Sequence, residues 1–89
     1  MSPTAPSTIS VRVLLFAAYA EAAGRDEETL AVDEPATAES VVQAFRARYP
    51  EADLVPPRPL VAINQVHATL KSPVRPGDEV ALLPPMAGG

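Results

Sequence analysis

The regular part of the chain begins with the run Ile9-Ser-Val-Arg-Val-Leu-Leu-Phe16. Every second residue from Ile9 to Leu15 is aliphatic, whereas the alternate positions begin with serine and arginine. A period of two with many β-branched residues predicts a β-strand. The alternate positions turn apolar at Leu14 and Phe16, and a strand end that is apolar on both faces is typical of a central strand.

Two helices and a second strand are predicted between this run and Pro50. Residues 17–23 are rich in alanine and stop at Gly24, which predicts a short helix closed by a left-handed residue. Residues 29–32 alternate and predict a strand that returns beside the first as a hairpin. Thr37 fits the N-cap of a longer helix that ends at Tyr49. Its apolar stripe recurs at helical spacing and comprises Ala38, Val41, Val42, Phe45 and Tyr49.

The remaining sequence predicts short strands joined by turns. The proline-rich segment 51–59 is expected to be a loop, followed by brief strands at residues 60–63 and 66–70. Residues 72–78 predict turns, and the apolar run Glu79-Val-Ala-Leu-Leu83 predicts the last strand. Because the first and last strands are the most apolar, we place them side by side at the sheet centre.

The expected fold class is α+β, a mixed sheet of about five strands packed on one main helix. With 89 residues, the chain has room for one domain. We expect this domain to span residues 9–83. Residues 1–8 are expected to form a disordered N-terminal tail, and residues 84–89 an extended C-terminal tail.

Composition excludes several classes of function. The net charge of −4 argues against binding to nucleic acid or to an anionic membrane. The absence of cysteine excludes a thiolate nucleophile and a cysteine-ligated metal, and the single histidine, His67, excludes a multi-histidine metal site. No apolar run approaches the roughly 20 residues of a membrane helix. The N-terminus does not resemble a secretory signal, so a cytoplasmic protein is expected.

The C-terminal run Pro84-Pro-Met-Ala-Gly-Gly89 is the feature that points most directly to chemistry. Proline cannot extend a sheet ladder, and the last two residues lack side chains. Six extended residues reach at most about 20 Å from the sheet. The run therefore predicts a thin thread that presents the carboxylate of Gly89 to another protein's active site, with Met86 packed in a groove of that partner.

Three segments of the chain resemble one family. They are Val11-Arg-Val-Leu-Leu-Phe-Ala17, Val61-Ala-Ile-Asn-Gln65, and the ending Pro76-Gly-Asp-Glu-Val-Ala-Leu-Leu-Pro-Pro-Met-Ala-Gly-Gly89. Together they are similar to the small, sulfur-carrying subunits of molybdopterin synthase, the MoaD/ThiS family of the ubiquitin-like β-grasp superfamily. The ending is the most specific segment. It departs from the family pattern at Leu82-Leu83, where an aromatic pair is usual, and at Met86, where a β-branched residue is usual.

The resemblance implies a mechanism and partners. An E1-like adenylyltransferase would use ATP and magnesium to adenylate Gly89, and a persulfide sulfur donor would convert it to a thiocarboxylate. The tail, comprising Pro84, Pro85, Met86, Ala87 and Gly88, would then enter the large, catalytic subunit of molybdopterin synthase. There the sulfur would pass to the cyclic pyranopterin precursor, in molybdenum cofactor biosynthesis. No cofactor or metal would be held by this chain, which would not be catalytic alone.

Other functions remain open at this stage. A carrier for thiamine or another sulfur pathway would use the same terminus. A ubiquitin-like modifier would join Gly89 to lysines of other proteins, and a plain interaction module would have an inert tail. Phe16, Leu82 and Leu83 are candidates for an apolar docking patch beside the tail, although each also fits core packing.

Overall fold

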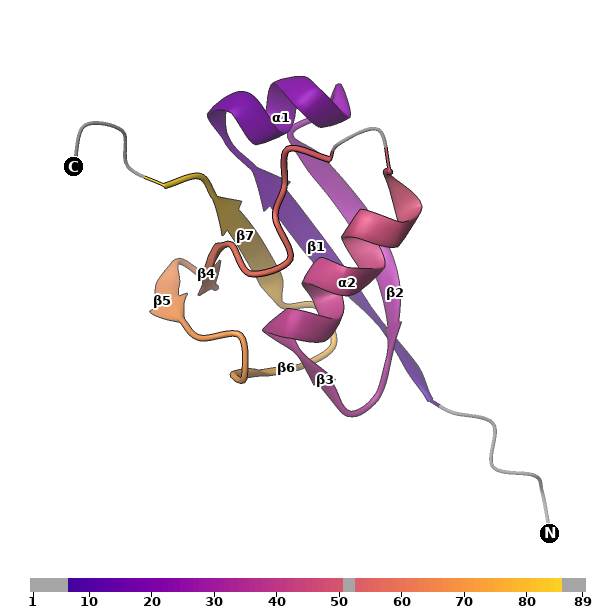
Figure 1. The fold of residues 1–89 in the computed structure, drawn as a ribbon. Coiled ribbons are helices and arrows are strands. Elements are labelled where there is room, and N and C mark those ends of the chain that lie inside the picture. The colour runs from indigo at the N-terminus through magenta and orange to yellow at the C-terminus, as the bar shows by residue number, and fades with distance from the viewer. Residues whose placement is uncertain (1–6, 51–52, 86–89) are drawn as a thin grey trace, which may run out of the picture.

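The computed structural model describes residues 7–50 and 53–85. Its main sheet has five strands in the order β2-β1-β7-β4-β5, and a separate two-stranded ladder joins β3 to β6 (Figure 1). The strands are β1 Thr8–Leu15, β2 Glu27–Asp33, β3 Ala36–Thr37, β4 Leu60–Ile63, β5 Val66–Ala68, β6 Pro73–Val74 and β7 Glu79–Leu83; the helices are α1 Ala17–Ala23 and α2 Ala38–Arg48.

The first and last strands lie together at the sheet centre, as the sequence predicts. β1 pairs with β7 in parallel, Val13 opposite Val80, and with β2 in antiparallel orientation, Val13 opposite Glu28. β4 runs antiparallel to β7 on its other side. The sheet is therefore mixed, and the predicted α+β fold class, with about five strands and one main helix, is confirmed.

The predicted helix ends are also confirmed. Gly24 closes α1 at φ 72°, in the left-handed region that glycine adopts at little cost. Thr37 caps α2 in a reciprocal capping box: its hydroxyl accepts from the Ser40 N–H, and the Ser40 hydroxyl accepts from the Thr37 N–H. Arg46 and Arg48 lie in the last turn of α2, where cations complement the helix dipole.

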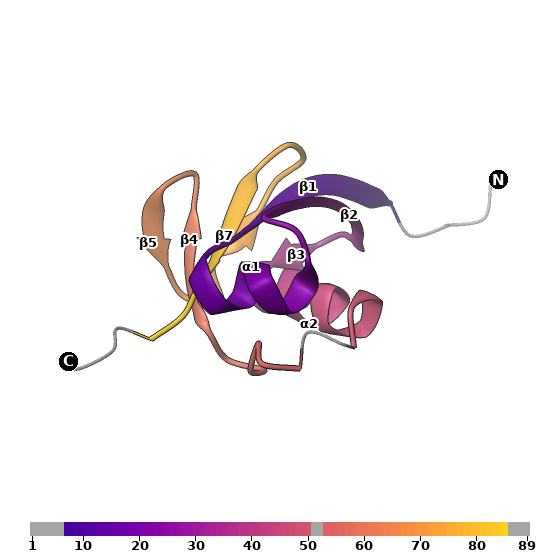
Figure 2. The same cartoon turned by 90° about the horizontal axis from the view of Figure 1, so that it is seen from above.

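One core lies between the sheet and the helices (Figure 2). The inward side chains of β1 and β7 pack there against the apolar stripe of α2, and Tyr19 and Ala23 of α1 join the same cluster. Phe45 is fully buried at its centre, with its ring centroid 5.1 Å from that of Tyr49. All of the stripe residues predicted for the long helix are buried.

The end of α2 is tied to the start of β2 by polar contacts. The Glu28 carboxylate accepts a hydrogen bond from the Tyr49 hydroxyl and pairs with Arg25 at 2.7 Å. These two contacts hold the pKa of Glu28 below its usual range, while the neighbouring carboxylate raises the pKa of Tyr49. The guanidinium of Arg25 also lies 4.9 Å from the Tyr49 ring centroid, a cation–π distance.

The structure differs from the sequence predictions at element ends. β1 begins at Thr8 rather than Ile9, and the Ser7 carbonyl accepts a hydrogen bond from the Glu34 N–H. Ser7 and Thr8 therefore continue the ladder and do not belong to a tail. β5 ends at Ala68, two residues early. The β3–β6 ladder was not predicted, because two-residue strands have no period to detect. Residues 1–6 lie outside the described part.

Asn64 and Asp78 lock two turns together at the end of the sheet where β7 begins. Asn64 Nδ2 donates to Asp78 Oδ1 at 3.0 Å, and the Glu79 N–H donates to Asn64 Oδ1 at 3.0 Å. Asp78 Oδ2 also accepts from the Arg75 N–H at 2.9 Å. The bond from Arg75, followed by that from Asn64, holds the pKa of Asp78 below its usual value.

We expect Asp78→Asn to lower the free energy of unfolding at pH 7 by about 1–2 kcal/mol, because charge-assisted hydrogen bonds to the turn are weakened. Since the pKa of Asp78 is lowered by folding, its contribution is present above about pH 4 and is lost as pH falls through the folded pKa. Urea unfolding from pH 7 to pH 2 measures this. The variant should differ most from the natural chain at pH 7 and least at pH 2; the exposed Asp53→Asn change serves as the control.

No helix in the described ranges 7–50 and 53–85 is long and apolar enough to cross a membrane.

Candidate functional site

The C-terminal tail starts from the middle of the sheet. β7 lies between β1 and β4, and it ends at Leu83 with Pro84 half-buried and Pro85 exposed. Figure 1 shows these residues leaving the sheet beyond the arrowhead of β7. Because β7 is hydrogen-bonded on both sides, its end is a rigid base for whatever follows. The predicted tail residues Met86, Ala87, Gly88 and Gly89 lie outside the described residues.

The sheet face that points away from α2 is apolar around this base. Side chains of directly paired residues share a face, so the register forms two rows across the strands. One row joins Leu14, Ala81 and Ala62, and the next joins Leu60 to Leu83. Phe16 follows β1 in extended backbone. The last pair of the ladder is Leu15 with Leu82, so continuing the alternation by one residue places Phe16 on this face, next to Leu83. We call Leu14, Phe16, Leu60, Ala62, Ala81 and Leu83 the outer patch.

Two large side chains of the outer patch are exposed to solvent. Phe16 is 46% exposed and Leu60 is 52% exposed, while Leu14 and Leu83 are half-buried. Together they make an apolar surface on two sides of the strand from which the tail leaves. Contiguous exposed apolar residues commonly mark a protein–protein contact.

The three docking candidates from the sequence are separated by the structure. Phe16 and Leu83 lie on the outer patch. Leu82 faces α2 and is completely buried in the core. The predicted docking role of Leu82 is therefore wrong, and the core-packing alternative is correct. Leu60 was missed, because the run 60–63 is apolar throughout and gives no alternation from which to assign its face.

Charged side chains border the outer patch: Arg12 and Glu79 form the next row along the strands, and Glu27 of β2 lies opposite Leu14. Arg12 of β1 lies opposite Glu79 of β7 and pairs with its carboxylate at 3.3 Å, and it also approaches Glu27 of β2 at 3.8 Å. The Arg12 and Glu27 side chains are about half exposed. Such surface pairs contribute little to stability, but charges at the border of an apolar contact favour one docking orientation.

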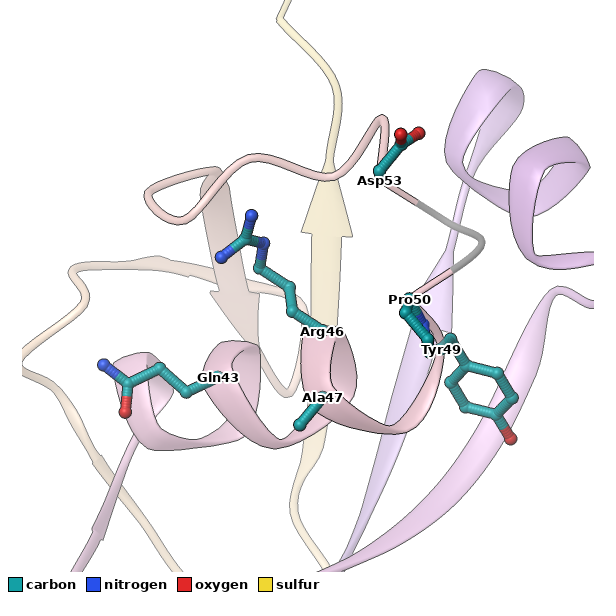
Figure 3. A pocket seen from close by; sticks show the side chains of 6 residues that line it. All are labelled: Gln43, Arg46, Ala47, Tyr49, Pro50 and Asp53. Carbon is teal, nitrogen blue, oxygen red and sulfur yellow. The ribbon is translucent and has the colours of Figure 1, made fainter.

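A hollow of about 420 Å³ lies away from the outer patch, between α2 and the loop that follows it (Figure 3). Gln43, Arg46 and Ala47 line it from the helix, and Asp53 from the loop. Arg46 holds the loop by donating from Nε to the Val55 carbonyl at 2.9 Å. None of the predicted site residues that the structure describes lines this hollow. We therefore interpret the contact of Arg46 with the loop as one that stabilises the fold.

The described residues offer no group of three or more side chains arranged to hold a metal. His67 is exposed on β5, opposite Ala62 of β4, and joins no such group. The feature of the described residues that the predicted site depends on is the central strand β7, which is followed by Pro84 and Pro85.

Comparison with known proteins agrees with this geometry. The model of the ThiS family matches residues 13–89. The molybdopterin synthase sulfur carrier subunit of Chlamydomonas reinhardtii is 35% identical over 83 residues, which cover 91% of this chain and all of that protein.

Solved structures show the same fold. SAMP1 from Haloferax volcanii, a small archaeal modifier protein, superposes with a TM-score of 0.79 at 32% identity, covering 90% of this chain and 99% of that one. A complex of subunits 1 and 2 of molybdopterin-converting factor from Helicobacter pylori contains a chain of the same fold, with a TM-score of 0.62 at 20% identity, covering 91% of this chain and 100% of that one. The β-grasp domain described here, with the tail that follows β7, is a member of the ThiS family.

Proposed function

We propose that this protein is the sulfur-carrier small subunit of molybdopterin synthase. The observation that supports the proposal most is the position of the tail: the run that ends in Gly88-Gly89 follows a strand at the rigid sheet centre, beside an exposed apolar patch. The relative from Chlamydomonas reinhardtii, which this chain matches over its whole length, bears this function in its name. The carrier and its partner would meet at the outer patch, and the tail would carry the sulfur.

The chemistry belongs to the carboxylate of Gly89. A carboxylate is a poor electrophile, so an E1-like partner first transfers AMP from ATP to it, with Mg²⁺ bound to the nucleotide, and releases pyrophosphate. The terminal sulfur of a persulfide then attacks the acyl carbon and displaces AMP. A thiol cleaves the resulting acyl disulfide, which leaves a thiocarboxylate on Gly89. Glycine at the last two positions keeps this carbon open to attack.

Delivery of the sulfur requires a second contact, with the large subunit. We propose that the outer patch docks there while the tail enters the active site, where the thiocarboxylate attacks the pyranopterin precursor. Docking by Phe16, Leu60 and Leu83 would fix the origin of a short tail. This fixing matters because a misplacement of about 1 Å at a reacting centre can cost on the order of a hundredfold in rate.

Leu60→Asp is expected to weaken binding to the large subunit by about 10–100-fold, because it introduces a charge into the centre of an apolar contact. Stability should change little, since the side chain is 52% exposed. Leu54→Asp is the matched control: Leu54 is 54% exposed but lies in the loop after α2. Calorimetric titration of both variants measures the effect. Equal losses for the two variants would show that the outer patch is not the docking surface.

A second function, covalent protein modification, is favoured by the resemblance to the small archaeal modifier protein. It would begin with the same adenylate, but a lysine amine of a target would attack the acyl carbon and form an amide. The two functions separate at the fate of Gly89.

Mass spectrometry of the C-terminal peptide tests the proposal. The protein is incubated with ATP, Mg²⁺, the E1-like enzyme and a persulfide donor. We expect one oxygen of Gly89 to be replaced by sulfur. Because oxidation of Met1 or Met86 adds nearly the same mass, the gain must be located by fragmentation. An unchanged carboxylate argues for an inert tail, and an amide to lysine argues for a modifier.

A further inference from the structure

β2 is an edge strand of the main sheet. On its outer side it presents backbone N–H and C=O groups that no described strand pairs. The Leu15 N–H donates to the Asp26 carbonyl, and the Glu34 N–H donates to the Ser7 carbonyl. These two bonds mark hydrogen-bonded residue pairs at both ends of the β1–β2 ladder. Because hydrogen-bonded and non-hydrogen-bonded pairs alternate along an antiparallel ladder, the even-numbered residues of β2 are the ones that bond to β1. The N–H and C=O groups of Glu27, Thr29, Ala31 and Asp33 therefore point outward, away from the sheet.

A hollow accompanies this edge. It has a volume of about 430 Å³ and lies between β2 and the flank of α2. Val32 and Pro35 line it on the strand side, and Ser40, Gln43 and Ala44 on the helix side. An added strand would place every second side chain over this hollow, and the others on the opposite face. The edge thus combines backbone groups that the described strands leave unpaired with a recess for side chains, the two elements of strand addition.

The charge of the β2 edge indicates which kind of partner strand it can bind. Residues 26–34 contain five carboxylates and no basic side chain. In a fully overlapped antiparallel pairing of two β2 strands, Glu27 of each copy would lie opposite Asp33 of the other. Like charges directly opposite one another destabilise a strand pair, so a second copy of the chain is disfavoured. A strand with basic residues at these two positions is favoured by the same charges.

We propose that the β2 edge binds an extended basic segment of a partner protein as a sixth strand of the main sheet. Small apolar side chains of the segment would enter the hollow beside α2. Its basic side chains would lie on the other face, opposite Glu27 and Asp33. This surface lies at the end of the strand order opposite β5. Its recess faces α2, away from the outer patch, and it meets the border of that patch at Glu27, which lies opposite Leu14 in the register.

The probe is the seven-residue peptide Lys-Val-Thr-Val-Thr-Val-Lys, acetylated and amidated at its ends. Its basic residues are spaced to meet Glu27 and Asp33, and its valines face the hollow. The peptide is added to the full-length ¹⁵N-labelled protein at a free concentration about ten times its Kd. It should then slow hydrogen exchange of the Thr29, Ala31 and Asp33 amides about elevenfold. Amide shifts of Gln43 and Ala44 should change with the same affinity. The same peptide with glutamate in place of lysine should bind at least about tenfold more weakly.

Two variants sharpen the test. Ala31→Pro removes an outward N–H that takes no part in the β1 ladder, so the fold is retained while strand addition is blocked. Asp33→Lys should weaken peptide binding about tenfold, whereas Asp53→Lys, the same charge change in an exposed loop residue, should weaken it less than about twofold. Circular dichroism checks that each variant folds.

Three results would overturn the proposal. The first is that the peptide shifts amide signals of the outer patch alone, or shifts none up to millimolar concentration. The second is that Ala31→Pro binds the peptide as tightly as the natural chain. The third is that the acidic peptide binds as tightly as the basic one. A dimer that light scattering detects and Ala31→Pro abolishes would assign the edge to a second copy instead. Sulfur loading of Gly89 should be unchanged in Ala31→Pro, so failure of this proposal is distinguishable from failure of the carrier function.

Discussion

Deleting Gly89 is expected to lower sulfur transfer to the pyranopterin precursor by on the order of a thousandfold or more. The truncated chain still ends in a carboxylate, that of Gly88, but this group is withdrawn by about 3.5 Å along an extended backbone. Both the adenylating and the transferring active sites would then hold the carboxyl carbon out of reach of the attacking atom. A single-turnover assay with the large subunit and a fragment-mass assay of loading measure the two steps.

The deletion leaves the folded domain intact, because β7 ends six residues earlier, at Leu83. The Tm of the deleted chain should therefore equal that of the natural chain. Gly89→Ala is the graded control: it keeps the length and the carboxylate but adds a methyl group beside the reacting carbon. We expect its activity to fall between those of the natural and deleted chains. Full activity of the deletion would exclude the carrier function and leave the interaction-module alternative.

Phe45→Ala is expected to destabilise the domain by about 3–5 kcal/mol, the usual cost of removing a buried aromatic ring. Phe45 is completely buried and contacts the Tyr49 ring at the end of α2. A domain of this size has a total stability near the low end of about 5–15 kcal/mol, so the loss is a large fraction of it. Part of the population should be unfolded at 37 °C, which urea unfolding and thermal scans detect.

Phe45→Leu is the matched control, since it keeps most of the apolar volume; we expect a loss of about 1–1.5 kcal/mol. The pair of variants separates packing from function. Sulfur loading of the folded fraction should be normal in both, because the ring lies in the core and Gly89 reacts in a partner. A loss below about 1 kcal/mol for Phe45→Ala would contradict the single shared core.

Local patterns in the sequence were sufficient to predict most elements. The capping residue Thr37, the stop at Gly24 and the apolar stripe ending at Tyr49 each act within a few residues, so helix limits were predicted closely. The alternation before Phe16 similarly predicted β1 and its central place. Where the pattern was short or uniform, prediction failed: the β3–β6 ladder was missed, and the face of Leu60 was unassigned.

The chain's sequence by itself determined most of the secondary structure and the shared core, since these depend on backbone propensity and side-chain period. It also contains the Gly-Gly ending on which the proposed chemistry depends. Only the tertiary structure decided which apolar residues remain exposed. The register of β7 against β1 and β4 turns Leu82 into the core and Leu83 outward, beside Phe16 and Leu60. A shift of one residue would exchange those roles, because side chains alternate between the faces of a strand. Pairing of residues so far apart in the chain is set by long-range packing, and the outer patch and the free β2 edge both follow from it.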